Sequence, residues 1–583
     1  MDCDLLVVGA GAGGMTAALV AAHEGLSVIL CEASDQAGGT TATSAGTLWL
    51  PGNRHGRTAG HADTLSEAAR YLEALVGTDD DRARRRAFLE SGDEAISYLE
   101  ARTAVKFTSA GVHPDYRVLP GAALAGRAIS PLPFDGRLLG RDFARIRPPI
   151  PEFMVLGGMM VGKADIQTLV NRWRSWHGLL GTFKLVLRHA TDRLRHARGT
   201  RLVMGNALVA RLFLSLREAG VDLRFGWRLD ALVQKEGRVT GARFTSPEGE
   251  RVLCARLGVV LATGGVGHHA ALRRELGPSG VPFVSLACDS VRGQGLFAAR
   301  EAGASLESPP HGNFLWQPAS RVPRAKSNAA GGGLFPHLFL DRAKPGLIAV
   351  DRRGRRFVNE AASYHHFVEG LVTHAQATGD SHAWLVCDAT FVHLWGLGII
   401  PPGTRALNRW VARGYITLAD SVDALARQVG IDAQGLVATV AQANEYATDG
   451  ADPQFRKGEA PVDRFNGDAG HRPNPCLGPL LQPPFVALPI HAADAASSAG
   501  LATDRDGRVL RGDGSVMHGL YACGNDAASV MGGTYPGPGA TLGPALVFGW
   551  RLARHAAHHA RTALAPNKTH GDTELDVLAR QAE

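Results

Sequence analysis

The chain has few cysteines for its length: seven among 583 residues, and no two of them form a Cys-x-x-Cys pair. Paired cysteines are typical of zinc sites and disulfide frameworks, so this spacing argues against both. Several of the seven lie in apolar runs, where a thiol behaves as a small hydrophobic side chain. We therefore expect a reducing compartment and no metal site.

Long uncharged apolar runs are missing as well. No stretch approaches the roughly 18 residues from which a membrane-spanning helix is built. No charged leader with a cleavage site precedes the first predicted strand, which begins by residue 4. The expected location is cytoplasmic. Peripheral contact with the inner face of the membrane stays open, and the apolar segment 153–161 is the place for it.

The chain also lacks a strong excess of charge. Its formal net charge of +7 and its pI near 9.1 are mild for 583 residues. Basic residues gather at 82–86, 141–147 and 188–201, which we interpret as solvated helix faces; attraction to anionic lipid or nucleic acid is the alternative. We expect no nucleic-acid partner.

What the sequence does contain is a dinucleotide fingerprint at its start. A short apolar run leads into Gly-Ala-Gly-Ala-Gly-Gly at 9–14, a helical pattern follows, and a second apolar run ends at Glu32. Gly9 permits the tight turn, Gly11 lets a pyrophosphate approach the backbone, and Gly14 lets helix and strand pack closely. The phosphates then bind at the helix start, and Glu32 accepts the ribose hydroxyls.

A second loop of small residues follows Glu32 directly, at 35–41 and 44–47. An NAD-binding fold continues into a plain helix at this point, whereas a flavin needs a close backbone path past its ribityl chain. The order of an acid followed by Gly-Gly-Thr-Thr resembles the glutathione-reductase-like FAD fold. The expected cofactor is FAD, bound without a covalent link.

Further along, residues 165–220 have a helical pattern, and short strands are predicted at 229–233, 239–245 and 251–254. A buried strand at 257–261 ends in Ala-Thr-Gly-Gly, a turn that returns to the cofactor in FAD folds. From about 286 the composition changes, with several tryptophans and a glycine-rich loop at 329–334.

These patterns predict an α/β fold with two domains. A glutathione-reductase-like Rossmann FAD-binding domain takes 1–285 and 456–560, and an inserted α+β catalytic (substrate) domain takes 286–455. Residues 541–555 are the predicted closing helix, and 561–583 form a polar C-terminal tail.

The segment 530–544 is the most informative for chemistry, because it sets Tyr535 among glycines and prolines just before a helix. The N–H groups at that helix start can face the flavin pyrimidine ring, where negative charge gathers on reduction. Tyr535 can donate a hydrogen bond to a substrate carbonyl, and the Gly539 N–H can donate a second. Together they form an oxyanion hole for an enolate.

Three segments resemble the 3-ketosteroid Δ1-dehydrogenases, which belong to the fumarate-reductase/succinate-dehydrogenase flavoprotein superfamily. They are 38–51, which begins Gly-Gly-Thr-Thr; 356–364, Arg-Phe-Val-Asn-Glu-Ala-Ala-Ser-Tyr; and 534–541, Thr-Tyr-Pro-Gly-Pro-Gly-Ala-Thr. The similarity runs from residue 4 to about 555. The stretch 497–501 lacks the lysine-glycine pair of the family, a departure that bears on the substrate more than on the reaction.

The resemblance implies desaturation of a 3-ketosteroid, or a similar cyclic 3-ketone, at C1–C2. A tyrosinate-like base takes a proton from C2 while a hydride leaves C1 for flavin N5, and an external electron acceptor reoxidises the flavin. Tyr364 matches the family's base, and Tyr116 matches the tyrosine that assists it. Tyr535 and the Gly539 backbone match the pair that polarises the ketone.

A tyrosine with its ordinary pKa near 10 needs a hydrogen-bonding or electropositive setting to act as a base. The sequence offers Arg355, Arg356, His365 and His366 as sources of charge near Tyr364. The two histidines form no ligand pattern with nearby Cys, Asp or Glu, so we interpret them as structural.

Other functions remain as alternatives. A fumarate-reductase-type enoate reductase needs cationic groups for a dicarboxylate, and the arginines of 352–356 are the candidates; the tyrosine turn argues against it, and no haem-attachment Cys-x-x-Cys-His is present. A C4–C5 ketosteroid dehydrogenase is a closer variant. A flavin-binding redox protein without turnover is disfavoured by the pairing of Tyr364 with Tyr535.

The residues expected to contact FAD come from these segments and from the strand ends that return to the cofactor. They are Gly9, Gly11, Ala12, Gly13, Gly14, Glu32, Ala33, Gly38, Gly39, Thr40, Thr41, Ser44, Ala45, Gly46, Val233, Ala262, Thr263, Gly264, Gly524, Asn525, Asp526, Ala540, Thr541 and Leu542.

Overall fold

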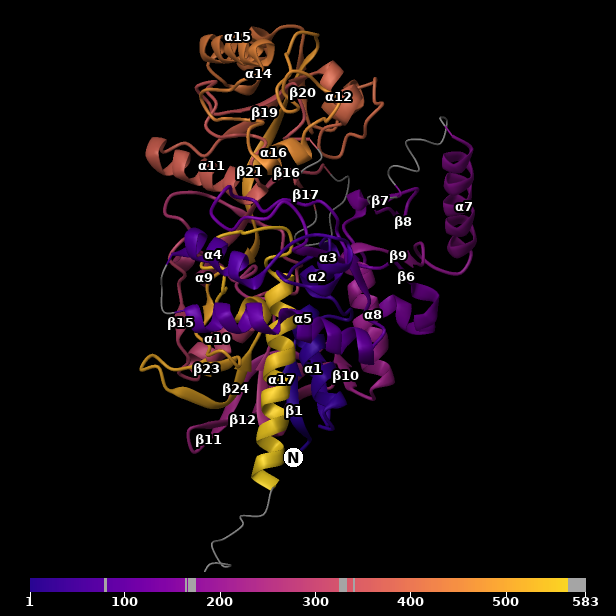
Figure 1. Ribbon diagram of the computed structural model, residues 1–583, viewed down its shortest axis with the longest axis vertical. Coiled ribbons are helices and arrows are strands. Elements are labelled where there is room, and N and C mark those ends of the chain that lie inside the picture. Colours follow the sequence, from indigo (N-terminus) through magenta and orange to yellow (C-terminus); the bar gives the residue numbers. More distant parts are fainter. Residues whose placement is uncertain (78–80, 163–164, 166–174, 324–332, 339–340, 565–583) are drawn as a thin grey trace, which may run out of the picture.

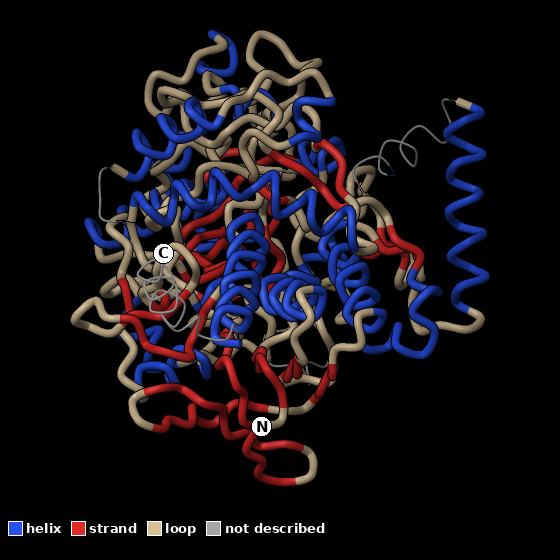
Figure 2. Tube along the Cα trace, turned by 60° about the horizontal axis from the view of Figure 1, so that its bottom comes forward, coloured by secondary structure: helices blue, strands red, loops and turns tan. Residues whose placement is uncertain are grey.

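The structure is a computed structural model that describes residues 1–77, 81–162, 165, 175–323, 333–338 and 341–564. Two sheets organise it, one in the lower half of the view in Figure 1 and one in the upper half. Strands lie both at the centre of the molecule, behind helices, and along its lower edge in the view of Figure 2. The candidate site lies between the two sheets.

The first strand of the fingerprint is at the centre of the lower, eight-stranded sheet. Strand β1 (Cys3–Val8) pairs in parallel with β2 (Val28–Glu32) on one side and with β13 (Gly249–Leu261) on the other. The strand order is β10-β2-β1-β13-β12-β11, with β24 paired to β13 and β23 paired to β24. The remaining strands are β10 (Asp222–Phe225), β11 (Arg228–Lys235), β12 (Arg238–Ser246), β23 (Arg508–Leu510) and β24 (Val516–Ala522). The parallel strands bring their carboxyl ends to one edge, where ligands bind in such folds.

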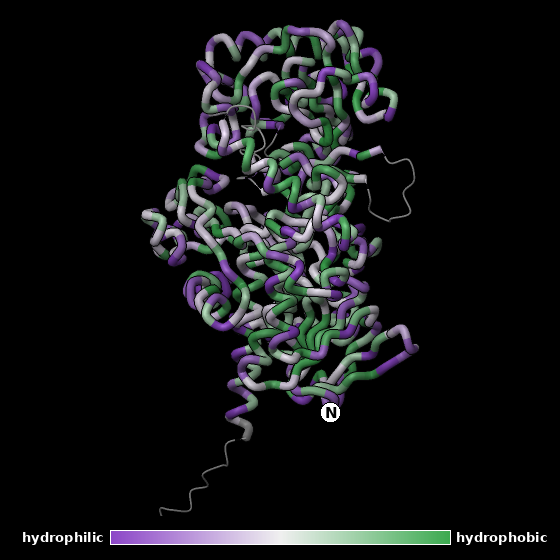
Figure 3. Tube along the Cα trace, turned by 90° about the vertical axis from the view of Figure 1, so that its right-hand side faces the viewer, coloured by the Kyte–Doolittle hydropathy of each residue, from purple (hydrophilic) through white to green (hydrophobic). Residues whose placement is uncertain are grey.

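Both faces of this sheet are buried, as expected for parallel strands that read as continuous apolar runs. Leu5 and Val7 face a core formed with α1 (Ala12–His23), α5 (Arg82–Arg102), α8 (Met204–Glu218) and α17 (Leu542–Leu564). Leu6 and Val8 face the opposite core. Hydrophobic segments accordingly gather inside the lower half of the molecule (Figure 3), and α17 runs along it (Figure 1).

The predicted strands at 239–245, 251–254 and 257–261 are present, but the last two form one long strand. The first half of β13 pairs antiparallel with β12, and its second half pairs in parallel with β1 and β24. The charged Arg256 interrupts the apolar pattern between the two halves. Its guanidinium is bound to Asp4 of β1 at 2.7 Å.

The upper sheet has seven strands, in the order β17-β16-β21-β19-β18, with β14 and β20 also paired to β21. The strands are β14 (Val284–Ser285), β16 (Phe314–Arg321), β17 (Leu334–Pro336), β18 (Leu347–Val350), β19 (Ala383–Asp388), β20 (Thr417–Ala419) and β21 (Phe485–Ser497). Strands were expected at 346–351 and 384–388, where β18 and β19 lie. Helix α11 (Tyr364–Thr378) lies beside β16 and β21.

The predicted return to the first domain at 456 comes too early. Strand β21 ends at Ser497 and is the central strand of the upper sheet, so the chain returns only after it. The sequence pattern misled because the run at 485–497 is apolar and suits either sheet. The departure at 286 agrees with β14, although α10 (Gln294–Glu301) still lies against β11 of the lower sheet.

Shorter elements complete the fold. Small strand pairs and triplets are β3 (Leu48–Trp49), β4 (Phe107–Ser109), β5 (Ala128–Pro131), β6 (Phe134–Asp135), β7 (Met154–Val155), β8 (Met159–Met160), β9 (Arg201–Leu202), β15 (Leu306–Glu307) and β22 (Gly500–Leu501). Further helices are α2 (Gly39–Thr43), α3 (Arg54–Thr58), α4 (Leu65–Val76), α7 (Trp176–Arg193), α9 (Ala270–Leu276), α12 (Ala389–Trp395), α13 (Asn408–Val411), α14 (Val422–Val429), α15 (Ala433–Asp449) and α16 (Pro461–Asn466).

Three sequence expectations differ from the structure or fall outside it. Within 165–220, helices α7 and α8 are separated by β9, and 166–174 are not among the described residues. The predicted closing helix ends at Leu564 rather than at 555, so the first residues of the predicted tail are helical. Most of the glycine-rich loop at 329–334 and the tail from 565 lie outside the described residues.

Candidate active site

A large cavity, of about 560 Å³, lies where the carboxyl ends of the lower sheet meet the upper sheet. It brings together most of the residues expected to bind the cofactor and all four expected at the reaction centre. Of the cofactor set, its walls include Gly9, Gly11, Ala12, Gly13, Glu32, Ala33, Gly39, Thr40, Thr41, Ser44, Ala45, Gly46, Ala262, Thr263, Gly264, Gly524, Asn525, Thr541 and Leu542. The reaction set on its walls is Tyr116, Tyr364, Tyr535 and Gly539.

The glycine fingerprint has the geometry that close approach requires. Gly9 has φ +107°, and a Cβ there would lie 2.2 Å from the Ala262 carbonyl oxygen. A Cβ on Gly14 would lie 2.0 Å from the Gly9 oxygen, so only glycine lets helix α1 pack against the turn. A Cβ on Gly11 would meet nothing within 4 Å, because Gly11 faces the open cavity. Gly11 is also the N-cap of α1 and has no side-chain cap. The Ala12 N–H donates to the Thr41 hydroxyl at 3.2 Å, and the N–H groups of Gly13 and Gly14 that follow are available to an anion.

Glu32 is fixed at the end of β2 by bonds to both carboxylate oxygens. The Ala10 N–H donates to Oε2 at 2.8 Å, and the Ser34 N–H and hydroxyl donate to Oε1 at 3.0 Å. Oε2, which accepts a single bond, keeps a lone pair for a ribose hydroxyl. The uncapped helix, the glycine turn and the oriented acid on one cavity wall therefore fit the nucleotide part of FAD.

Five residues of the expected cofactor set do not line this cavity. Gly14 and Gly38 act through close packing. Asp526 lies behind the wall, where it accepts hydrogen bonds from the Thr263 hydroxyl at 3.0 Å and the Gly265 N–H at 2.8 Å and so holds that turn in place. Ala540 lines a smaller neighbouring cavity instead.

Val233 is the fifth, and it lies away from the cavity wall. Trp227 and Leu229, earlier in the same hairpin, line the cavity. Val233 is four residues beyond Leu229, about 13 Å further along an extended strand, and it pairs with Gly241 toward the hairpin end.

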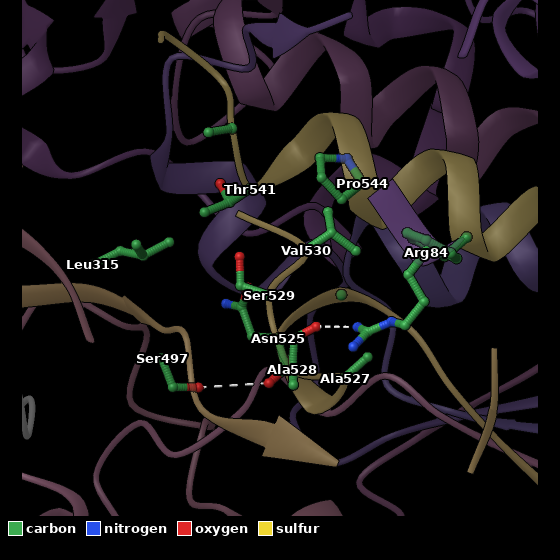
Figure 4. Close-up of a pocket in the computed structure, with 13 residues that line it drawn as sticks. Arg84, Leu315, Ser497, Asn525, Ala527, Ala528, Ser529, Val530, Thr541 and Pro544 are labelled. Atoms are coloured by element: carbon green, nitrogen blue, oxygen red, sulfur yellow. Dashed lines mark hydrogen bonds between the residues drawn. The ribbon is translucent and has the colours of Figure 1, made fainter. Parts of the chain in front are cut away.

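The smaller cavity, of about 30 Å³, lies behind the loop 524–530 and the start of α17 (Figure 4). It has room for one or two waters. The guanidinium of the buried Arg84 reaches the Ala528 carbonyl oxygen there, and Ser497 bonds the Asn525 carbonyl oxygen on the other side. These contacts fix the loop that carries Asn525 into the wall of the large cavity.

Three buried tyrosines from distant parts of the chain meet at the cavity wall. The Tyr116 hydroxyl donates a hydrogen bond to the Tyr364 hydroxyl at 3.2 Å. The Tyr116 and Tyr535 rings stack with centroids 5.7 Å apart. Tyr364 meets both rings edge-on, with centroids at 5.5 and 5.1 Å.

Each tyrosine is positioned by backbone rather than by side-chain contacts alone. Tyr364 is the first residue of α11, whose N-cap Ser363 accepts a hydrogen bond from the His366 N–H. A helix N-terminus favours negative charge, so this position favours a phenolate. The Tyr116 N–H donates to the Pro536 carbonyl oxygen at 2.9 Å, which ties it to the turn that carries Tyr535.

Burial works against ionisation of these phenols. It raises the pKa of Tyr364 well above its ordinary value, and the neighbouring Tyr116 and Tyr535 raise it further. Burial likewise raises the pKa of Tyr116 and of Tyr535. A tyrosine base in this cluster therefore needs a nearby positive charge.

The charged residues expected from the sequence are not arranged to supply a positive charge to the tyrosines. Arg355 is exposed, and Arg356 is bound to Glu360 and Asp452 at 2.7–2.8 Å. Burial lowers the pKa of His366 to about 3, so this ring is neutral near pH 7. His365 is buried, with Nε2 3.0 Å from Glu369 and Nδ1 bonded to the Trp316 N–H.

Gly539 is held against the first domain's loop in a conformation that suits glycine. Its φ is +93°, and a Cβ would lie 2.3 Å from the Thr47 carbonyl oxygen. Its own carbonyl oxygen accepts from the Trp49 N–H at 3.1 Å, and the Gly543 N–H donates to the same oxygen at 3.0 Å. These bonds anchor the turn to the loop that holds Thr47 and Trp49.

Sequence reasoning missed much of the wall that lies beyond the tyrosines. His113, Gln317, Pro336 and Leu338 contribute to it, together with Ile150, Glu152, Phe153, Val155 and Val161 from an irregular segment. The only signal for the last group was the apolar run at 153–161. Among the described wall residues there is no arginine or lysine, so the expected arginines of 352–356 do not reach the cavity.

Comparison with known proteins bears on the same residues. The sequence model described as the FAD binding domain matches residues 4–542. The 3-oxosteroid 1-dehydrogenase of Mycobacterium tuberculosis is 36% identical, with 96% of this chain and 99% of the relative covered. The chain belongs to the 3-ketosteroid Δ1-dehydrogenase family of FAD-binding flavoproteins. This confirms the family, the enzyme class and the cofactor predicted from the sequence: an FAD-dependent oxidoreductase.

Two further proteins are similar to this chain over most of their length. The 4-oxocyclohex-2-ene-1-carboxylate 5-dehydrogenase of Sinomonas cyclohexanicum is 38% identical, covering 96% of this chain and 94% of its own. The crystal structure of the 3-ketosteroid delta1-dehydrogenase from Sterolibacterium denitrificans, in complex with 1,4-androstadiene-3,17-dione, superposes with a TM-score of 0.87 at 34% identity, covering 96% and 99%.

Two searches of the described part of the chain gave no site of another kind. None of its helices is long and apolar enough to cross a bilayer. Nor does it bring three or more His, Cys, Asp or Glu side chains together in a way that could hold a metal ion.

Proposed function

We propose that this enzyme introduces a C1–C2 double bond into a 3-ketosteroid or a similar cyclic 3-ketone. The observation that carries the proposal is the meeting of Tyr116, Tyr364 and Tyr535 at the wall of the cavity, with Gly539 on the same wall. A phenol–phenol hydrogen bond beside two potential donors to a ketone is a suitable arrangement for removing a proton next to a carbonyl.

In the proposed reaction Tyr364 takes the proton from C2, and Tyr116 assists by hydrogen bonding to the Tyr364 oxygen. Tyr535 and the Gly539 N–H donate to the ketone oxygen and stabilise the enolate as it forms. FAD, when bound, supplies the acceptor for the hydride that leaves C1. An external acceptor then takes the electrons, so that the proton and the hydride together account for the two hydrogens lost.

The substrate class is supported by the composition of the wall. Beyond the tyrosines it is largely apolar, with Ile150, Phe153, Val155, Val161 and Leu338. A carboxylated cyclohexenone, the substrate named for one relative, is better matched by a cationic side chain, and the described wall has none. The same lack removes the support for a dicarboxylate-reducing enoate reductase.

The first experiment is anaerobic mixing of the purified holoenzyme with androst-4-ene-3,17-dione while the oxidised flavin absorbance is recorded. Rapid bleaching, with a product lighter by two hydrogens at C1 and C2, supports the proposal. A saturated analogue that loses hydrogens at C4–C5 instead would assign the C4–C5 reaction. A yellow protein that bleaches with neither, nor with 4-oxocyclohex-2-ene-1-carboxylate, would contradict the proposed dehydrogenase.

The role of Tyr364 is tested by Tyr364→Phe, which we expect to abolish desaturation while FAD stays bound. Tyr521→Phe is the matched control, since Tyr521 is also buried but bonds His555 at 3.2 Å on the lower sheet, away from the three tyrosines. Equal turnover in the two variants would remove Tyr364 as the base.

We also propose that the enzyme binds a lipid surface at its periphery, through helix α7 and the β7–β8 hairpin. Trp176, Leu180, Phe183 and Leu187 recur at helical spacing along α7, and each is more than half exposed. Helix α7 stands apart from the body (Figures 1 and 2). Such an apolar face, accompanied by the exposed Lys184, is typical of helices that lie in a membrane interface.

The hairpin extends this surface toward the cavity. Leu156 is 62% exposed at its tip, and Val155 is both exposed and part of the cavity wall. The predicted contact at 153–161 thus becomes part of a larger surface beside the cavity. An apolar substrate can then pass from lipid to the site without crossing water.

Co-sedimentation with vesicles that contain phosphatidylglycerol tests this surface. We expect the unaltered protein to sediment and Leu180→Asp/Phe183→Asp to stay in solution. Val437→Asp, at another exposed apolar position, on α15, is the control and should sediment. Failure of the unaltered protein to bind, or binding by the α7 variant, would contradict the proposal.

A further inference from the structure

A buried hydrogen bond lies beneath the turn that carries Tyr535 and Gly539. The indole Nε1–H of Trp49 donates to Oδ1 of Asp115 at 2.8 Å, and both residues are buried. Trp49 belongs to β3, whereas Asp115 is 66 residues further along the chain and directly precedes Tyr116. Neither side chain lines the large cavity, so any part that they have in the reaction is played through the residues they hold.

Trp49 supports the turn on one side. Its backbone N–H donates to the Gly539 carbonyl oxygen at 3.1 Å. A Cβ on Gly537 would lie 2.7 Å from the Trp49 Nε1 and 3.0 Å from the Asp115 Oδ1. The turn therefore lies directly on the Trp49–Asp115 hydrogen bond, and a glycine at 537 leaves room for that contact.

Asp115 holds the segment that carries Tyr116. Its N–H donates to the Ala123 carbonyl oxygen at 2.9 Å, and its Oδ2 accepts from the Ala123 N–H at 3.0 Å and from the Arg127 guanidinium at 2.6 Å. Burial raises the pKa of Asp115 to about 6, against the lowering effect of Arg127, so the carboxylate is mostly ionised near pH 7. Oδ1 is thus available as an acceptor for the Trp49 indole.

Two links consequently hold the turn against the Tyr116 segment. One is the bond from the Tyr116 N–H to the Pro536 carbonyl oxygen at 2.9 Å. The other runs from Asp115 through the Trp49 indole and backbone to Gly539. Pro536 and Gly539 are the two ends of the stretch that follows Tyr535, so each link fixes one end. Loss of the second link leaves the Gly539 end with fewer contacts to hold it.

We propose that Asp115 is a positioning residue for the proposed dehydrogenation, which sets the place of the Gly539 N–H relative to Tyr116 through the Trp49 indole. The inference rests on the proposed function, in which Gly539 donates to the ketone oxygen and Tyr116 assists the base. A donor displaced by about 1 Å costs about 100-fold in rate. Smaller displacements also matter, because hydrogen bonds weaken with distance and angle.

Two variants break the Trp49–Asp115 bond from opposite sides. Trp49→Phe keeps an aromatic ring and every charge but removes the indole N–H. Asp115→Asn keeps the shape but turns an amide N–H₂ toward another donor, either Trp49 or Arg127. FAD content and melting temperature are recorded for each variant.

Asp63→Asn is the matched control. The Asp63 carboxylate also binds the Arg127 guanidinium, at 3.0 Å, and its side chain is 4% exposed against 2% for Asp115. Its other bond is with the Gly52 N–H at 2.7 Å, so it makes no contact with the Trp49 indole N–H. Asp63→Asn therefore weakens the hold on Arg127 while the Trp49–Asp115 bond stays in place.

The measurement is kcat and KM of each holoenzyme with a 3-ketosteroid, repeated with deuterium at C2 and separately at C1. We expect Trp49→Phe and Asp115→Asn each to lower kcat about tenfold or more, with a smaller change in KM and a larger C2 isotope effect. The C1 effect should not rise, because a displaced donor stabilises the enolate less and so slows proton removal more than hydride transfer. Asp63→Asn should lower the melting temperature but keep both isotope effects of the unaltered enzyme.

A double variant tests whether the two residues act through the same bond. Trp49→Phe/Asp115→Asn should be about as slow as the slower single variant, since one bond can be removed only once. Effects on kcat that multiply would show that the residues act separately and would overturn the proposal. If Asp115→Asn fails to fold, the isotope effects of Trp49→Phe alone decide.

Failure of this inference and failure of the proposed function give different results. Absence of turnover in the unaltered enzyme would contradict both. With turnover present, a Trp49→Phe variant that folds, binds FAD and has the C2 isotope effect of the unaltered enzyme overturns the role of Asp115 alone. So does an Asp63→Asn variant with the same enlarged C2 effect as Asp115→Asn, since the effect would then come from Arg127.

Discussion

Replacing Gly539 with alanine tests the ketone-polarising turn at its tightest point. A Cβ there would lie 2.3 Å from the Thr47 oxygen, 2.5 Å from its carbonyl carbon and 2.7 Å from the Leu48 Cα. All three are backbone atoms, so no side-chain rotation relieves the overlap. Ordinary contact distances exceed 3 Å, and the turn must therefore move by about 1 Å.

The substitution has two expected effects, one on stability and one on rate. The φ of +93° costs alanine about 1–2 kcal/mol relative to glycine. Misplacing a donor by 1 Å costs about 100-fold in rate, comparable with the loss of one oxyanion-hole donor. We expect Gly539→Ala to lower kcat about 100-fold or more, with a melting temperature that falls by only a few degrees.

The matched control is Gly514→Ala. Gly514 has a φ of +81°, and a Cβ on it would meet nothing within 4 Å, so this variant carries the backbone penalty without the clash. Stopped-flow measurement of flavin reduction compares the two variants at saturating ketone. If Gly539→Ala reduces its flavin as fast as Gly514→Ala, the Gly539 N–H is not a donor to the substrate and the assignment of this turn is wrong.

Three further predictions concern the framework of the site. Glu32→Gln should weaken FAD binding to the apoprotein about tenfold, since a charged acceptor is replaced by a neutral one; equal affinity in a fluorescence titration would contradict the ribose assignment. Arg127→Met should lower the free energy of unfolding by about 3 kcal/mol or more, because Arg127 is buried between Asp63 at 3.0 Å and Asp115 at 2.6 Å; an unchanged melting temperature would refute this. Burial raises the pKa of Glu360, but Arg356 and Lys457 outweigh it and lower that pKa to about 2, so the stability it contributes is present above about pH 4.5 and is lost as the pH falls toward 2. Melting temperatures of Glu360→Gln should accordingly vary less over that range than those of the unaltered protein.

The parts of the site that the sequence predicted are those encoded locally. Gly9, Gly11 and Glu32 lie within one strand-turn-helix-strand unit, and each is placed by its immediate neighbours. The turn around Tyr535 is likewise set by glycines and prolines within a few residues. Local encoding is why a pattern in the sequence was sufficient for both.

The errors have a common physical origin in tertiary packing. The role of β21 depends on partners from β14 to β20, which no local pattern reveals. Arg356 lies close to Tyr364 in sequence but is neutralised by Asp452, almost a hundred residues away. Arg342 lies 22 residues before Tyr364 and reaches the site only because its guanidinium bridges two loops.

Two of the three tyrosines, Tyr116 and Tyr535, are held together by one turn. The Pro536 carbonyl oxygen accepts from both the Tyr116 N–H at 2.9 Å and the Tyr71 hydroxyl at 2.8 Å. Gly539 anchors the same turn to Trp49. Tyr116 and Tyr535 are thus fixed to each other on the side of the first domain.

Tyr364 is not fixed to that turn by any backbone bond in the described structure; it arrives from the upper sheet at the start of α11. The base and the ketone-polarising donors therefore belong to different halves of the molecule. Their separation is set by how the start of α11 is held, and the Arg342 bonds to Glu360 and Ala362 are among the contacts that hold it. In the proposed reaction, this separation determines whether the base and the donors act on the same ketone.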